Sequence, residues 1–214
     1  MEFLYCALLG YFIGAINPSY IIAKIKGFDI RKKGSRNAGA SNALINFGKT
    51  VGILCGAFDI LKATGAILLA QALMSDFAYA FAVTATACIV GHIFPFYMGF
   101  KGGKGTSCLG GMVLAFDWRV FLIMLAIEIV LVLITDYLCF MPITASVAFP
   151  IIYGIMRADL IGALIIGIST AVILIKNIEN ITRIKNGCEM HLSYLWNKDK
   201  ETERMKNATD GKYE

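Results

Sequence analysis

Charged residues are scarce in this sequence. Asp, Glu, Lys and Arg make up only 16% of its 214 residues, and it has two histidines, two tryptophans and four prolines, whereas 57% of the residues are hydrophobic. The charges also stand in a few blocks instead of being scattered as on a water-facing surface. This composition excludes an ordinary water-soluble domain and predicts an all-α polytopic membrane protein.

Paired cysteines with metal-type spacing are absent as well. The six cysteines lie singly, mostly inside apolar runs: Cys6, Cys55, Cys88, Cys108, Cys139 and Cys188. We expect them to be buried small side chains, and we predict no metal, no organic cofactor and no nucleic-acid partner. The spacing of a nucleotide-binding loop is missing too, so ATP hydrolysis has no support.

Six apolar runs each come near the ~20 residues that a membrane-spanning helix needs. They cover residues 3–25, 50–74, 77–98, 119–138, 139–157 and 159–176. A seventh, 106–116, is too short, because its length at about 1.5 Å per residue cannot cross a hydrocarbon core of about 30 Å. We predict a single membrane domain over 1–188 with about seven helices, one of them short or re-entrant, and with the first retained instead of cleaved.

The basic residues predict the orientation, because lysine and arginine accumulate in short cytoplasmic loops. Residues 26–49 carry six basic residues against one acid, Asp29. We expect this loop, the loop with Lys101 and Lys104, and the C-terminus to be cytoplasmic, and the N-terminus to be outside a bacterial inner membrane. Charge of this kind alone favours orientation over binding. The polar residues 189–214 are expected to be a disordered cytosolic tail.

The segment GHIFPFYMGFKGGKG at 91–105 is the most informative, because it sets two lysines among glycines directly after an apolar run. Glycines allow backbone N–H groups to approach an anion closely, and a helix that starts at Thr106 points the positive end of its dipole there. This predicts an anion cradle. His92 either belongs to it or is satisfied by a neighbouring helix.

Two further segments have compositions suited to an anion. GSRNAGASN at 34–42 presents small hydroxyl and amide side chains that suit a phosphate or a polyol, although ordinary turns have the same composition. The nearby basic residues equally suit anionic lipid headgroups. In NIENITRIKNGCE at 177–189, Asn177 and Asn180 share a helix face with Arg183 beyond them. The alternative there is an amphipathic interfacial helix.

Four charges lie within the apolar runs, where the bilayer penalises them: Asp59, Lys62, Glu128 and Asp136. Asp59 and Lys62 are three residues apart on one expected helix, so we predict that they pair with each other or with the loop residues near the cytoplasmic end. Their role in that case is purely structural.

Together these segments resemble the bacterial acyl-phosphate:glycerol-3-phosphate acyltransferase family of integral membrane enzymes. The motifs are GSRNAGASN, DILK at 59–62, GHIFP with FKGGKG, and NIENITRIKNG, in the family's order. The resemblance implies seven membrane helices and a cytosolic site. It also implies transfer of a fatty acyl group from acyl phosphate, not from acyl-CoA or acyl carrier protein, to the 1-hydroxyl of glycerol 3-phosphate. The products are lysophosphatidic acid and phosphate, and membrane lipids are the surroundings.

The resemblance also implies roles for individual residues. The expected catalytic residues are Ser35, Lys104 and Asn180. The expected substrate-binding residues are Arg36, Asn37, Asn42, His92, Lys101, Gly102, Gly103, Gly105, Asn177, Arg183 and Glu189. The family lacks the His/Asp dyad of other glycerolipid acyltransferases, and so does this chain. We hypothesise that a substrate phosphate oxygen takes the proton of the attacking hydroxyl.

Four positions depart from the family pattern. Arg36 replaces a usual glycine, Ile45 a usual arginine, Asn177 a usual histidine and Pro142 a usual serine. Each lost charge-assisted hydrogen bond is worth about 1.5–3 kcal/mol. The alternatives are therefore a divergent paralogue with another acceptor, an anion-binding or transport protein without acyl transfer, and a non-catalytic scaffold. A transporter is expected to show two similar halves with interrupted helices, which the sequence does not.

Overall fold

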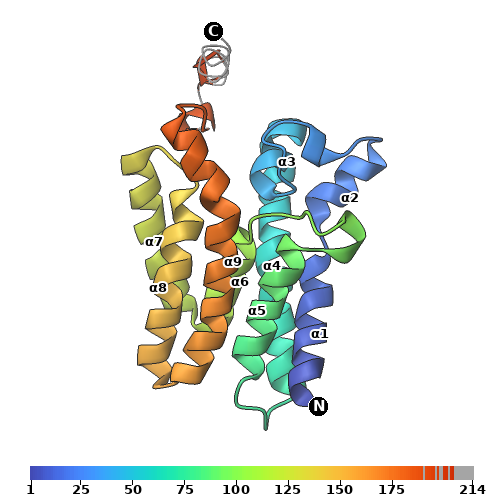
Figure 1. The fold of residues 1–214 in the computed structure, drawn as a ribbon, viewed down its shortest axis with the longest axis vertical. Helices are drawn as coiled ribbons and strands as arrows, with labels where there is room; N and C mark the ends of the chain where they lie inside the picture. Colours follow the sequence, from blue (N-terminus) through green and yellow to red (C-terminus); the bar gives the residue numbers. More distant parts are fainter. Residues whose placement is uncertain (190, 196, 198–199, 202, 205–214) are drawn as a thin grey trace.

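The computed structural model describes residues 1–189, 191–195, 197, 200–201 and 203–204. Within these residues every regular element is a helix, and the helices run along one axis with the N-terminus at one end of the molecule and the C-terminus at the other (Figure 1). The elements in chain order are α1 Glu2–Ala15, α2 Pro18–Ile25, η1 Ile30–Lys32, α3 Ala40–Phe47, α4 Lys49–Leu73, α5 Ala80–Ile93, η2 Phe96–Met98, α6 Thr106–Phe116, α7 Trp118–Thr135, α8 Phe140–Arg157, α9 Leu160–Lys185 and η3 Leu192–Leu195.

The helices confirm the predicted all-α membrane fold. Five spans in the described chain are long and apolar enough to cross a membrane, α1 with α2 makes a sixth that is bent by 41°, and α6 is a shorter apolar helix. The bend interrupts the run that the sequence shows as continuous. It lies at Asn17, whose carboxamide oxygen accepts a hydrogen bond from the Tyr20 N–H at 2.9 Å and so caps α2, with Pro18 at the first helical position.

Small residues let the helices approach closely around α5, most of whose residues are buried. A side chain at Gly14 of α1 would overlap the Cys88 carbonyl of α5, and one at Gly91 would overlap the Tyr11 carbonyl. On the other side, a side chain at Gly111 of α6 would overlap the Ile60 carbonyl of α4. Such contacts are typical of helix packing in membranes, where lipid supplies no hydrophobic driving force between helices.

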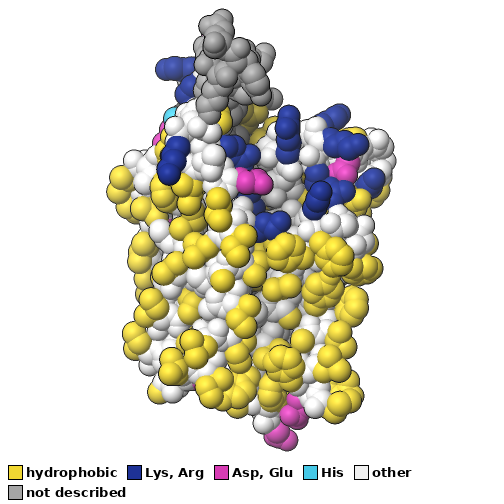
Figure 2. All heavy atoms as spheres, in the orientation of Figure 1, with side chains coloured by type: hydrophobic (Ala, Val, Ile, Leu, Met, Phe, Trp, Pro, Cys, Tyr) yellow, Lys and Arg dark blue, Asp and Glu magenta, His cyan; other side chains and the backbone are white. Residues whose placement is uncertain are grey.

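Charge and apolar surface are separated along the axis. Figure 2 shows apolar side chains covering the flank of the bundle, and lysine and arginine gathered at the end where the C-terminus lies. The opposite end of this face shows a few acidic side chains. The loop 26–39 and the end of α9 lie at the basic end, and the loop 94–105 lies deeper, at the end of α5 that faces it (Figure 1). The segments singled out in the sequence are therefore on the same side of the molecule.

The first part of the expected tail contacts the bundle. The Leu192 N–H donates to the Asp136 carbonyl at 2.7 Å, and Tyr137 and His191 form an isolated antiparallel bridge. The remainder of the predicted tail, residues 205–214 with 190, 196, 198–199 and 202, lies outside the described residues.

Candidate functional site

Four of the predicted residues form a polar cluster where α9 ends. The carboxamide oxygen of Asn180 accepts hydrogen bonds from the Lys104 ammonium and, at 2.8 Å, from Nη2 of Arg183. Arg183 Nε lies 2.9 Å from a carboxylate oxygen of Glu189. Lys104 comes from the loop before α6, whereas Asn180 and Arg183 are one turn apart on α9. We call these four residues the rim cluster.

The rim cluster carries more positive than negative charge. Burial, together with the nearby charge of Arg183, lowers the pKa of Lys104 to about 8. Burial raises the pKa of Glu189, while Arg183 and Lys104 act in the opposite direction. Two cations beside one carboxylate leave a net charge that suits an anion, and Asn180 fixes the directions of both cations.

The glycine-rich loop is built differently from the expected cradle. The Gly102 N–H donates to the Ile93 carbonyl at 2.9 Å, and the Gly103 N–H donates to the His92 carbonyl at 3.1 Å. Both groups therefore close the loop onto the end of α5, and the prediction that they face an anion is wrong. Glycine is needed at 103 because a side chain would overlap the ring of His92. Gly105 has φ +85° and caps α6.

His92 belongs to a second charged group, which lies beneath this loop. Lys62 pairs with Asp59 at 2.6 Å, as the spacing predicts, and its ammonium lies 3.2 Å from His92 Nδ1. Lys62 also donates to the Ile16 carbonyl, where α1 meets α2. All three side chains are buried. We call Asp59, Lys62 and His92 the buried triad; it joins α4, α5 and the bend of the first span.

Asn42 organises the first predicted loop from inside. Its side chain is 0% exposed. Its oxygen accepts from the Ser35 N–H at 2.9 Å, and its amide nitrogen lies 2.8–3.0 Å from the carbonyls of Ile30, Lys33 and Asn37. The structure therefore makes Asn42 a scaffold of the loop, in place of the ligand-contacting residue that we expected.

The other residues of the first loop remain accessible. Ser35 and Asn37 are partly exposed and Arg36 is exposed. Arg36 has φ +58°, a left-handed conformation that glycine adopts without strain, which explains why a glycine suits this position. The left-handed conformation of Arg36 was not predicted, because the sequence Arg-Asn-Ala-Gly is also typical of an ordinary turn.

Contacts between side chains and backbone hold the first loop beside the glycine-rich loop. The guanidinium of Arg31 donates to the carbonyls of Met98 at 2.5 Å and Lys101 at 3.3 Å. A Cβ at Gly56 would lie 3.4 Å from Ala40 of α3 and 3.8 Å from the hydroxyl of Ser107 in α6. The predicted segments therefore meet across α4, although the side chain of Lys101 itself is exposed.

The role of Arg31 as a bridge was missed. The sequence did contain a sign that Arg31 is held in place, because Asp29 stands two residues before it. In the structure the Asp29 carboxylate lies 2.7 Å from Arg31 Nη2, and Arg31 lowers the pKa of Asp29 to about 2.

Asn177 lies one turn before Asn180 and points inward. It is 0% exposed, and its amide nitrogen donates to the Ile173 carbonyl of its own helix at 2.9 Å. Its oxygen has no hydrogen-bond partner among the residues that the structure describes. Asn177 therefore offers a neutral acceptor where the family resemblance leads one to expect histidine.

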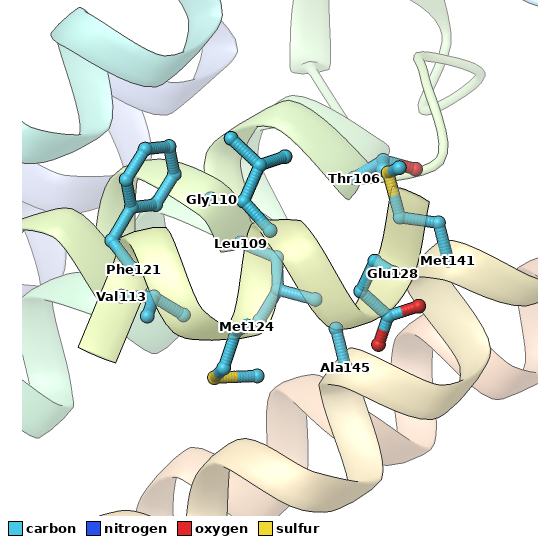
Figure 3. A pocket seen from close by; sticks show the side chains of 10 residues that line it. Thr106, Leu109, Gly110, Val113, Phe121, Met124, Glu128, Met141 and Ala145 are labelled. Atoms are coloured by element: carbon cyan, nitrogen blue, oxygen red, sulfur yellow. The ribbon is translucent and has the colours of Figure 1, made fainter. Parts of the chain in front are cut away.

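An apolar groove begins beside the glycine-rich loop and was not anticipated from the sequence. It has a volume of about 60 Å³ and lies between α6, α7 and α8. Figure 3 shows Thr106, Met141 and Glu128 at one end, and Val113 and Phe121 at the other. Thr106 is two residues beyond Lys104, so the groove starts next to the rim cluster. The carboxylate of Glu128 accepts a hydrogen bond from Thr144 at 2.7 Å.

This combination of a positively charged side-chain cluster and an apolar groove agrees with what the chain resembles. Residues 4–187 match the model of the glycerol-3-phosphate acyltransferase family. The chain belongs to this family. A relative named glycerol-3-phosphate acyltransferase 1, from Oceanobacillus iheyensis, is 37% identical in an alignment 210 residues long that covers 92% of this chain and 99% of that protein. A glycerol-3-phosphate acyltransferase from Thermotoga petrophila is 35% identical over 85% of this chain and 92% of its own length.

The fold of this family member is also similar to that of solved structures. It resembles the crystal structure of PlsY, described as an integral membrane glycerol 3-phosphate acyltransferase, in the glycerol 3-phosphate form. The TM-score is 0.81 at 31% identity, over 91% of this chain and 98% of that one. The lysophosphatidic acid form of the same protein gives a TM-score of 0.77 at 30% identity, over 89% and 95%.

Proposed function

We propose that this protein is a membrane acyltransferase that moves a fatty acyl group from acyl phosphate to the 1-hydroxyl of glycerol 3-phosphate. The products are lysophosphatidic acid and inorganic phosphate, and the activity serves phospholipid synthesis. Family membership and the two ligand forms of the solved relative support this proposal. The observation that carries it is the rim cluster, two cations around Asn180, at the mouth of an apolar groove.

The reaction mainly requires that the two substrates are bound and aligned. Acyl phosphate is a mixed anhydride with a good leaving group, so the site must hold two anions and bring a hydroxyl to the carbonyl carbon. The hydroxyl oxygen forms the new bond to that carbon, the bond from the carbon to the phosphate oxygen breaks, and phosphate leaves. The hydroxyl proton passes to a phosphate oxygen of the substrate.

Each part of the site has a role in this scheme. Lys104 and Arg183 stabilise phosphate charge as it develops on the leaving group, and Asn180 keeps both cations in place. The hydroxyl of Ser35 and the side chains of Asn37 and Arg36 bind the acceptor from the opposite loop. The groove between α6 and α8 receives the first part of the acyl chain, and the rest of the chain lies in lipid.

The site faces the cytoplasm in this proposal. The loop 26–39 lies at the basic end of the molecule and the loop 94–105 on the same side, and basic loops stay on the cytoplasmic side. With seven crossings, α6 included, the N-terminus is then outside and the C-terminus inside a bacterial inner membrane. A cysteine introduced at Lys49, at the basic end, would react with an impermeant maleimide only after the cells are opened.

A second candidate keeps the chemistry and changes the acceptor. Asn177 is bonded to its own helix and brings no positive charge, and Ile45 is apolar. The acceptor is then a phosphorylated alcohol other than glycerol 3-phosphate.

The test is acyl transfer by the purified full-length protein in detergent or lipidic mesophase. Palmitoyl phosphate is supplied with glycerol 3-phosphate, and phosphate release is followed together with lysophosphatidic acid. We expect both products at equal rates, and a loss of about 10²–10³-fold in Lys104→Ala, comparable to removal of a main charge-stabilising group. Lys49→Ala, which removes an exposed lysine from the same end, serves as the matched control. Phosphate release without the lipid would instead support another acceptor, and neither product from folded protein would refute acyl transfer.

A further inference from the structure

The described residues that follow the family match, from 188 onwards, pack against the basic end of the bundle. The family model ends at residue 187, and the residues that follow lie against the turn between α7 and α8. The Leu192 N–H donates to the Asp136 carbonyl at 2.7 Å. The backbone and hydroxyl of Ser193 lie 3.1 and 3.2 Å from the Asp136 carboxylate. We call His191–Leu195, with Glu201 and Arg204, the strap.

His191 ties the two parts of the strap together. Its Nδ1 lies 3.3 Å from Asp136 and 3.5 Å from Glu201, and its ring packs edge-on against Tyr137 with the ring centroids 4.8 Å apart. Glu201 is only 6% exposed, although it lies in a polar segment. A polar segment that buries a carboxylate against a histidine is held in a defined place.

Arg204 connects the strap to the rim cluster. Its Nη1 donates to the Gly187 carbonyl at 2.5 Å, and its Nη2 donates to the Glu189 carbonyl at 2.6 Å. Glu201 holds the other edge of the same guanidinium at 2.9 and 3.1 Å. The planar fork of arginine makes these bonds at once, which a lysine cannot do.

The residue that Arg204 holds is the anionic member of the rim cluster. The Glu189 side chain pairs with Arg183, Arg183 donates to Asn180, and Asn180 accepts from Lys104. The backbone of Glu189 is otherwise attached through its N–H to the Arg183 carbonyl at 3.2 Å. The position of the carboxylate therefore depends on the strap as well as on α9.

We infer that Arg204 is a positioning residue of the acyltransferase site: it fixes the backbone at Glu189, so that the carboxylate holds Arg183 in the direction that presents Asn180 to Lys104. The inference depends on the proposed function, because it concerns the site at which acyl transfer takes place. Arg204 itself touches no substrate. Its contribution comes from a segment outside the family match.

The test compares Arg204→Gln with Lys200→Gln in the full-length protein. Both changes remove one positive charge from the same segment, and Lys200 is exposed. We expect Arg204→Gln to lower kcat/KM for acyl transfer about fivefold, the effect of one or two lost hydrogen bonds, when it is assayed at a temperature at which the variant remains folded. Arg204→Lys should restore part of the loss, and Lys200→Gln should match the wild type.

A double-mutant cycle separates positioning from a general effect on folding. If Arg204 acts through Glu189, Arg204→Gln should have little further effect in a Glu189→Gln background. Additive losses, or an Arg204→Gln enzyme equal to Lys200→Gln, would each overturn the inference.

Hydrogen exchange provides a readout that does not need activity. The amides of Cys188 and Glu189 both donate to the Arg183 carbonyl, at 2.9 and 3.2 Å. They should exchange faster in Arg204→Gln and not in Lys200→Gln. If the wild type transfers no acyl group but this difference is seen, the proposed function fails while the strap contact stands. If the exchange rates are equal, the strap inference fails even in an active enzyme.

Discussion

The rim cluster and the buried triad use similar side chains for different ends. Each contains a lysine bonded to a side chain three or more residues away, and a glycine-rich loop separates them. In the triad, Lys62 has Asp59, the ring of His92 and the Ile16 carbonyl around it, so its hydrogen bonds are made within the protein. In the rim cluster, the Lys104 ammonium donates to the carboxamide oxygen of Asn180, which also accepts a hydrogen bond from Arg183.

The difference shows what distinguishes a structural charge from a binding charge. A buried ammonium with a carboxylate and a carbonyl is already compensated, and a substrate would have to break that arrangement. Among the residues that the structure describes, the Lys104 ammonium bonds one amide oxygen, which it shares with a second cation. It therefore keeps free donors and net positive surroundings within that part of the chain. We therefore propose that the triad contributes to stability and that the rim cluster binds the anion.

Substituting each lysine in turn should give the largest difference between the two clusters in stability and activity. Lys62→Ala leaves Asp59 buried without its cation, which costs about 3–5 kcal/mol, so we expect a large fall in the thermal midpoint in detergent and poor yield of folded protein. Lys104→Ala should leave the midpoint within a few degrees while acyl transfer falls about 10²–10³-fold. Equal midpoints for the two variants would show that the triad is not structural.

Gly103 is where the two regions touch, and a methyl group there tests their coupling. A side chain would overlap the ring of His92, so Gly103→Ala should displace the loop that carries Lys104. A shift of about 1 Å at a reacting group can cost about 10²-fold, and we expect a loss of ten- to a hundredfold in kcat/KM. Gly99→Ala is the matched control, since Gly99 has φ +62° and no other atom within 4 Å of an added Cβ. Its effect should be limited to a small loss of stability.

Much of the fold could be predicted because the bilayer constrains it. The apolar runs gave six spans and a short helix, and the spacing of Asp59 and Lys62 gave their ion pair. The bend at Asn17 was not predicted, although Asn followed by Pro is a signal for a helix start, because the apolar residues on both sides favour one continuous helix. The Asn17 amide also donates to the Ala38 carbonyl at 2.8 Å, a contact that the sequence does not show.

The structure brings several of the residues predicted for the site into contact, but not with the expected geometry. The pairing of Lys104, Asn180 and Arg183 joins segments that the sequence had marked separately. Composition does not show where an N–H or an amide points. The Gly102 and Gly103 N–H groups turn back to α5, and Asn42 turns into its own loop, because each satisfies a carbonyl that the fold would otherwise leave unpaired.

The pH dependence of acyl transfer tests the role of Lys104 without any change to the sequence. The pKa of Lys104 is lowered from 10.5 to about 8, so the charged form is complete below that pH and is lost as the pH rises through it. If the ammonium binds substrate phosphate, kcat/KM should fall above pH 8, by about tenfold per unit at the limit.

Lys104→Arg decides whether this limb belongs to Lys104. A guanidinium stays protonated throughout, so the variant should be slower but should lose the falling limb. Lys49→Arg, at an exposed position of the same end, should keep the wild-type profile. A limb that persists unchanged in Lys104→Arg would belong to another group or to the substrate. The functional distinction between the rim cluster and the buried triad would then have to be carried by Arg183, the other cation of the rim cluster.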